Sequence, residues 1–95
     1  MELNHLRYFY EVAKAGSFTA ASQNLRVSQP SLSKAVALLE DREGVKLLDR
    51  SKKGVKLTAL GEGIFQDCRQ IFKLVEKTKH KCEDSLGLCQ GPLRI

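Results

Sequence analysis

Apolar residues recur at helical spacing from the start of the chain to residue 43, with two short interruptions. The first stretch predicts a helix from Asn4, as N-cap, to Ala15, ended by Gly16. A second helix is predicted to start at Ser17 as N-cap, with Phe18, Ala21 and Leu25 on its buried face. The expected buried stripe of the first helix is Leu6, Phe9, Tyr10 and Ala13.

The third helical stretch follows after only three residues, so the second and third helices must turn sharply against each other, as in a helix-turn-helix. Ser28 is the predicted N-cap and Gly44 the predicted stop, which bounds a helix over 29–43. Pro30 falls in the first turn, where its missing N–H costs little. The expected buried face is Leu32, Ala35, Val36 and Leu39.

After Gly44 the period changes from helical to alternating. The segments "VKLLDR" and "GVKLT" read as short extended stretches, and "SKKG" between them reads as a turn with two lysines. Three helices followed by a basic hairpin predict a mainly α fold, a winged helix-turn-helix over residues 1–57 with a two-stranded wing.

Helical periodicity returns from Thr58 and predicts a long linker helix over 58–86, followed by a hinge at 87–95 that leads into a further domain. Its apolar residues step by four and three, which is the seam of a helix that pairs with another helix. Folding back on its own domain is the alternative. The residues proposed for dimerisation are Ile64, Cys68, Ile71 and Val75.

The net charge of +5 is concentrated in the middle of the chain. Residues 26–57 hold eight basic and four acidic side chains, whereas 1–25 and 58–93 are balanced. This distribution is expected if the central third meets a polyanion. The sequence has no apolar run long enough for a membrane span and no apolar signal segment, so we expect a cytoplasmic, nucleoid-associated protein.

Several motifs together resemble the N-terminal region of LysR-type transcriptional regulators. They are "LRYF", "GSFTAAS", "SQPSLSKAVALLE", "GVKLLDR" and "GVKLT", and "GPLRI" is similar to the start of that family's effector-binding domain. The resemblance implies sequence-specific binding to duplex DNA by a homodimer joined through antiparallel linker helices, with a tetramer expected in a full-length regulator. A small-molecule effector would bind only through a C-terminal domain beyond these residues.

Side-chain chemistry and the resemblance indicate the same recognition surface. The third helix presents an amide, a hydroxyl and an amine on its outer face, groups that can read bases in a major groove. By position, the resemblance implies base contacts for Gln29, Pro30, Ser33 and Lys34, phosphate contacts near Ser17 and Ser28, and wing contacts for Arg50 and Lys53. Lys34 and Lys53 stand where the family often has arginine.

Other functions receive less support from the sequence. His5 and His80 lie in different helices without a triad or metal spacing, so neither an enzyme nor a cofactor is expected. His80, Cys82 and Cys89 could be read as a metal or redox site, but no fourth ligand stands at a usable spacing. A winged helix that binds protein instead of DNA is the remaining alternative, since fold does not fix function.

Overall fold

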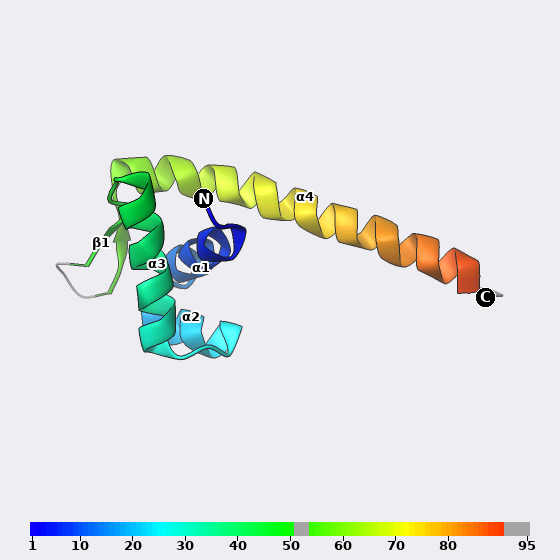
Figure 1. Ribbon diagram of the computed structural model, residues 1–95, viewed down its shortest axis with the longest axis horizontal. Helices are drawn as coiled ribbons and strands as arrows, with labels where there is room; N and C mark the ends of the chain where they lie inside the picture. Colours follow the sequence, from blue (N-terminus) through cyan, green and yellow to red (C-terminus); the bar gives the residue numbers. More distant parts are fainter. Residues whose placement is uncertain (51–53, 91–95) are drawn as a thin grey trace.

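The computed structural model describes residues 1–50 and 54–90, with side chains described up to residue 85. Three helices form a compact group, and a fourth crosses one end of it and then projects away (Figure 1). The predicted fold class, mainly α with a two-stranded wing, is confirmed. The elements in chain order are α1 (Leu3–Ala15), α2 (Phe18–Leu25), α3 (Gln29–Glu43), β1 (Leu48–Asp49), β2 (Lys56–Leu57) and α4 (Ala59–Gln90).

Helix α1 has a different N-cap from the one predicted. Glu2 caps it, because the Glu2 carboxylate accepts a hydrogen bond from the backbone N–H of Asn4 at 2.8 Å, so the assignment of Asn4 was wrong. Gly16 ends the helix as expected, in the left-handed conformation at φ 81°. The core face is Leu6, Phe9 and Val12, while the predicted Tyr10 and Ala13 lie half-buried at its edge.

Helices α2 and α3 form the predicted helix-turn-helix. Ser17 and Ser28 cap them, and Arg26, at φ 58°, makes the left-handed turn between them. Gly44 ends α3, again in the left-handed conformation. The four predicted apolar residues of α3, Leu32, Ala35, Val36 and Leu39, are all buried.

The wing is an antiparallel pair of short strands in which Leu48 faces Leu57 and Asp49 faces Lys56. Each strand has two residues, fewer than the alternating pattern suggested. The backbone N–H of Val55 donates to the carbonyl of Gly16 at 3.3 Å, which ties the hairpin to the turn between α1 and α2. The predicted lysine turn, 51–53, lies outside the described residues.

Helix α4 is anchored at its start by a close backbone approach. The hydroxyl of Thr58 accepts from the N–H of Gly61 at 3.0 Å and donates to the carbonyl of Lys46 at 2.8 Å. A Cβ added at Gly61 would lie 2.1 Å from the carbonyl oxygen of Leu47, so only glycine fits there. The helix runs to Gln90, past the predicted end at residue 86, because a single glycine such as Gly87 weakens a helix without breaking it.

The first half of α4 belongs to the core of the winged domain. Cys68 and Phe72 are buried in the same cluster as Leu6 and Phe9. The ring of Tyr10 on α1 also lies 5.2 Å from Phe65 and 5.5 Å from Phe72, measured between centroids. The predicted division of the chain at residues 57 and 58 therefore does not separate two packing units.

Candidate nucleic-acid interface

The outer face of α3 presents small polar and basic groups at the start of the helix. Gln29, Pro30 and Lys34 are exposed, and Ser33 is half-buried beside them. Their spacing in the helix places all four on one side, opposite the buried apolar face. The structure thus brings together the four residues that were predicted to face bases.

Gln29 is held by a neighbour that the sequence did not indicate. The hydroxyl of Thr19 on α2 donates a hydrogen bond to Oε1 of Gln29 at 3.3 Å. This contact leaves the amide NH₂ of Gln29 available as a donor. The two helices of the helix-turn-helix therefore cooperate in orienting the first side chain of α3.

Ser17 and Ser28 use their hydroxyls to cap helices. Oγ of Ser17 accepts from the N–H of Ala20 at 3.0 Å, and Oγ of Ser28 accepts from the N–H of Ser31 at 3.2 Å. A helix N-terminus carries partial positive charge and free N–H groups, which suit a phosphate. Both serines therefore lie at positions compatible with their predicted role near phosphates, through the helix ends that they order.

Arg50 connects the wing to both helices of the helix-turn-helix. Its Nη1 donates to Oγ of Ser33 at 3.1 Å, and its guanidinium lies 4.6 Å from the ring centroid of Phe18. Nη2 also lies 3.9 Å from Oε1 of Glu40. Arg50 keeps 38% of its side chain exposed, so it can orient Ser33 and still meet an anion. Lys53, the other predicted wing residue, lies outside the described residues.

Glu40 is a buried structural residue that sequence reasoning did not identify. Its side chain is 5% exposed, and Oε2 accepts hydrogen bonds from the backbone N–H groups of Leu47 and Leu48 at 2.8 and 3.1 Å. These charge-assisted bonds fix the wing against α3. One signal was available, because Glu40 follows Val36 by four residues and so falls on the buried stripe.

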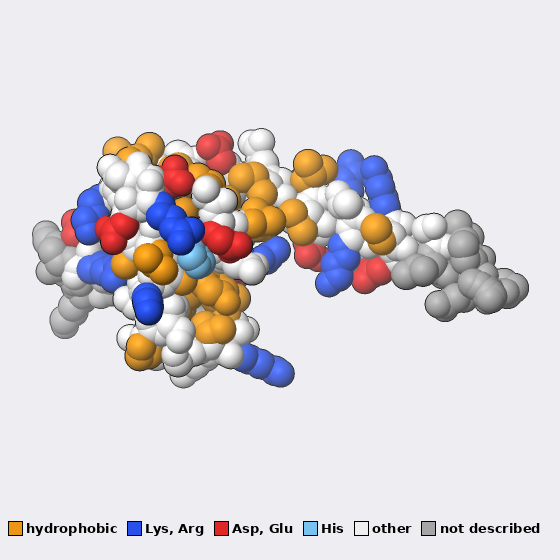
Figure 2. Space-filling model, in the orientation of Figure 1, with side chains coloured by type: hydrophobic (Ala, Val, Ile, Leu, Met, Phe, Trp, Pro, Cys, Tyr) orange, Lys and Arg blue, Asp and Glu red, His pale blue; other side chains and the backbone are white. Residues whose placement is uncertain are grey.

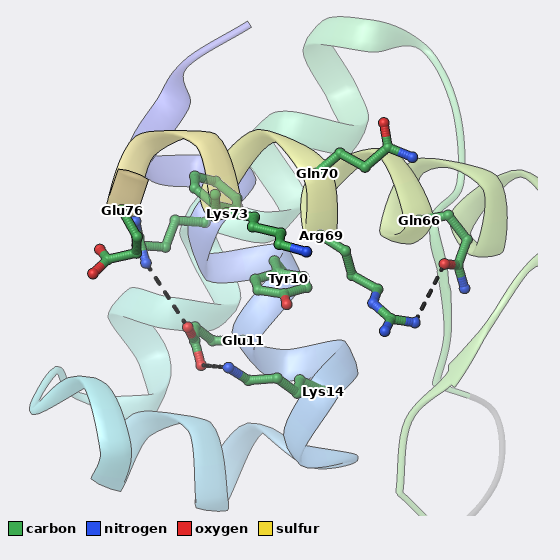
Figure 3. Close-up of a pocket in the computed structure, with 10 residues that line it drawn as sticks. Tyr10, Glu11, Lys14, Gln66, Arg69, Gln70, Lys73 and Glu76 are labelled. Atoms are coloured by element: carbon green, nitrogen blue, oxygen red, sulfur yellow. Dashed lines mark hydrogen bonds and ion pairs between the residues drawn. The ribbon is translucent and has the colours of Figure 1, made fainter. Parts of the chain in front are cut away.

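A cleft lies between α1 and α4 (Figure 3). It has a volume of about 650 Å³, and no residue of α3 lines it. Charged side chains already satisfy one another there, since Glu11 pairs with Arg7 at 4.0 Å and with Lys14 at 3.5 Å. Arg7 also lies over the ring of Phe72 at 4.4 Å. The contact of Arg7 with Phe72 holds α4 against α1. The cleft does not adjoin the predicted base-reading face of α3.

Helix α4 exposes large apolar side chains on one face. Hydrophobic atoms are visible along the part of the helix that projects from the domain (Figure 2). Ile71 and Val75 are on this face as predicted, and Ile64 is half-buried against the domain. Cys68 requires a correction: its side chain is 0% exposed in the domain's own core, so it offers no surface for dimerisation. Over residues 59–85, where side chains are described, the exposed large apolar residues of α4 are Leu60, Ile71, Leu74 and Val75.

Burial also changes the chemistry of Cys68. Desolvation, with a smaller contribution from the negative charge of Asp67, raises the pKa of its thiol to about 11. A protonated, buried thiol is a poor nucleophile and a poor metal ligand. Cys82 is exposed, and His80 pairs with Glu83 at 3.2 Å.

The described residues lack the groupings that a metal site or a membrane span would need. Within residues 1–50 and 54–90, no group of three or more His, Cys, Asp or Glu side chains could hold a metal ion. Cys89 was considered with His80 and Cys82 as a metal or redox site, and it lies in the part of α4 where side chains are not described. In the same part of the chain, no helix is both long and apolar enough to cross a membrane.

Curated relatives of the chain are transcriptional regulators. The HTH-type transcriptional regulator TfdT of Cupriavidus pinatubonensis is 37% identical over 95 residues, covering 100% of this chain and 42% of that protein. The Hca operon transcriptional activator HcaR of Escherichia coli is 51% identical over 79 residues, covering 83% of this chain and 27% of that protein. The chain therefore spans less than half the length of these relatives.

Solved structures with the same fold include complexes with DNA. The BenM_DBD/catB site 1 DNA complex has a TM-score of 0.84 at 36% identity, covering 88% of this chain and 93% of that one. The CbnR_DBD–DNA complex has a TM-score of 0.79 at 38% identity, covering 90% and 99%. The family model described as bacterial regulatory helix-turn-helix protein, lysR family, matches residues 3–62. The chain therefore belongs to the LysR family, as the resemblance in its motifs predicted.

Proposed function

We propose that this chain is the DNA-binding part of a bacterial transcriptional regulator, which binds a specific duplex sequence with α3 in the major groove. The observation that carries the proposal is the outer face of α3, where Gln29, Ser33 and Lys34 stand together at the end that would enter the groove. Related domains at 36% and 38% identity form complexes with DNA, which supports DNA binding by this chain.

Each group on this surface has a distinct role in the proposal. Gln29 reads adenine through its amide, Ser33 and Lys34 contact base edges or phosphate, and Pro30 meets a thymine methyl. The N-termini of α2 and α3, ordered by Ser17 and Ser28, face phosphates. Arg50 and Lys53 of the wing supply further charge toward the backbone, which sets position and salt dependence but not sequence preference.

The proposed assembly is a homodimer joined through α4. The exposed apolar face of this helix is available to a second copy, since nothing in the described part of the chain covers it. Two symmetry-related copies of α3 would then read half-sites about one helical turn apart, roughly 34–36 Å. In the full-length regulator, tetramer contacts and the effector site belong to residues beyond this chain.

The proposal places the protein in the cytoplasm with the chromosome and gives it no catalytic role. Its named relatives are regulators of transcription. The competing reading, a winged helix that binds only protein, predicts acidic or apolar groups on the outer face of α3. The groups found there are small, polar and basic.

Replacing Gln29 with alanine tests the base-reading role. We expect Gln29→Ala to weaken binding to the selected operator by about 1–3 kcal/mol and to relax the preferred sequence. Fluorescence anisotropy on operator and on random duplex, at one salt concentration, measures both. Gln66→Ala, an exposed glutamine on the side of α4 away from its apolar face, is the matched control and should change neither. Equal losses on operator and random DNA would remove Gln29 from base recognition, and no binding to any duplex would refute the function.

A further inference from the structure

Three residues at heptad spacing form a charge pattern along the exposed face of α4. Asp67, Leu74 and Lys81 are an acid, a leucine and a base, each seven residues from the next. All three are exposed, and among the side chains of α4 described up to residue 85, Leu74 is the most exposed large apolar one, at 62%. Seven residues correspond to about two turns, so the three side chains lie in one row.

The charges at the ends of this row lack partners within the described chain. No ion pair of Asp67 or Lys81 occurs among residues 1–50 and 54–85. The residues one turn from Asp67 on α4 are Gly63, Ile64, Gln70 and Ile71, none of which is basic. Asp67 is therefore an uncompensated acid beside the apolar residues proposed for dimerisation.

The order of acid, leucine and base is self-complementary under one kind of symmetry. A two-fold axis through Leu74, with the helices antiparallel, brings each Asp67 opposite Lys81 of the partner subunit. The two pairs then lie about 10.5 Å on either side of the axis, seven residues at about 1.5 Å each. In a parallel pair, Asp67 would face the partner's Asp67 and Lys81 the partner's Lys81, and both contacts would be repulsive.

The same alignment also fits the apolar residues of the helix. With the axis at Leu74, Leu74 meets its own symmetry copy, and Ile71 packs near the partner's Val75. Ile71 and Val75 are 37% and 36% exposed in the single chain, so both have surface left to bury. The ion pairs flank this apolar strip, the position that charged residues occupy beside a helix seam.

We propose that Asp67 and Lys81 set the register and antiparallel direction of the α4 dimer, by pairing across a two-fold axis at Leu74. This inference rests on the proposed dimerisation through α4 and specifies how the two helices align. A second copy of the chain is the occupant of this surface, because the charge pattern matches itself.

Charge reversal with rescue tests the pairing. Asp67→Lys and Lys81→Asp should each raise the dimer dissociation constant of the 95-residue chain about tenfold in analytical ultracentrifugation, because each places two like-charge contacts in the dimer. The double variant Asp67→Lys/Lys81→Asp should return it to within about twofold of the original. Single variants without effect, or a double variant no better than either single one, would overturn the pairing.

Two matched controls carry the same charge changes on the side of α4 away from the apolar face. Lys73→Asp and Glu76→Lys should leave the dissociation constant unchanged. If they weaken the dimer as much as the test variants, net charge and not register governs assembly, and the proposal fails.

Cross-linking locates the axis independently. In a background with Cys82→Ser and Cys89→Ser, Leu74→Cys should be captured as a dimer by a short bifunctional thiol reagent. Thr78→Cys should not, because its two copies would be separated by about 12 Å along the helices. Efficient capture at position 78 instead of 74 would overturn the register while leaving dimerisation intact. A chain that sediments as a monomer would refute the underlying dimer.

Discussion

The two halves of α4 share one helix and one apolar periodicity, yet they have different environments. Cys68 and Phe72, in the first half, are buried against α1, whereas Leu74 and Val75, one turn farther on, are exposed. The helix leaves the domain near this point (Figure 1), and the side of the helix also matters, since Ile71 is exposed between buried Cys68 and Phe72. Apolar residues spaced regularly by three and four therefore indicate that a helix buries one face. They do not indicate whether its own domain or a second chain packs against that face.

The largest expected effect comes from the buried half. Phe72→Ala should lower the free energy of unfolding by about 3–5 kcal/mol, because Phe72 is 5% exposed and packs against Tyr10 and Arg7. Urea denaturation followed by circular dichroism, at a concentration where the chain is monomeric, measures the loss. Leu74→Ala is the control, with an expected change below about 0.5 kcal/mol. Equal losses from both variants would mean that the two halves of α4 are not distinct.

Local features of the fold could be predicted from the sequence because they depend on neighbouring residues. The caps Ser17 and Ser28 and the stops Gly16 and Gly44 all follow from side chains within a few positions. The same reasoning misplaced the first cap, since the carboxylate of Glu2 reaches the N–H of Asn4 and makes Glu2 a better start. Glu2 and Asn4 are both possible caps two residues apart, and the backbone conformation at the start of the helix decides between them.

The candidate site could be predicted as a surface but not as a set of contacts. The outer face of α3 follows from helical spacing alone. By contrast, the contacts of Arg50 with Ser33, Phe18 and Glu40 join three elements that are distant in the chain. The burial of Cys68 is equally non-local, since it depends on α1 lying beside α4. Helical periodicity predicts which face of a helix is apolar, but it does not predict which other element packs against that face. Sequence reasoning therefore missed both the contacts of Arg50 and the burial of Cys68.

A smaller effect is expected from the exposed apolar face of α4, and it should change assembly without changing folding. Ile71→Asp places a charge on the apolar face in both copies of a dimer, so the dimer dissociation constant should rise more than hundredfold, about 3 kcal/mol. Sedimentation velocity measures the change. Gln66→Asp adds the same charge on the side of α4 away from this face and should leave the dimer intact. A persistent Ile71→Asp dimer would show that the chain associates through another surface.

The smallest effect is expected from a comparison of two thiols on α4, those of Cys82 and Cys68. Alkylation of these thiols tests the helix without first changing its packing. In a Cys89→Ser background, alkylation at pH 8 should modify exposed Cys82 rapidly and buried Cys68 slowly. Burial raises the pKa of Cys68 from 9.0 to about 11, a difference of two that lowers its thiolate fraction about a hundredfold below pH 9. Because only the thiolate reacts, the rate at Cys68 should keep rising with pH up to about 11, while the chain stays folded. Mass spectrometry of peptides containing each cysteine follows both rates. Comparable rates at pH 8 would mean that α4 separates readily from α1, so that its two halves differ less than their exposures indicate.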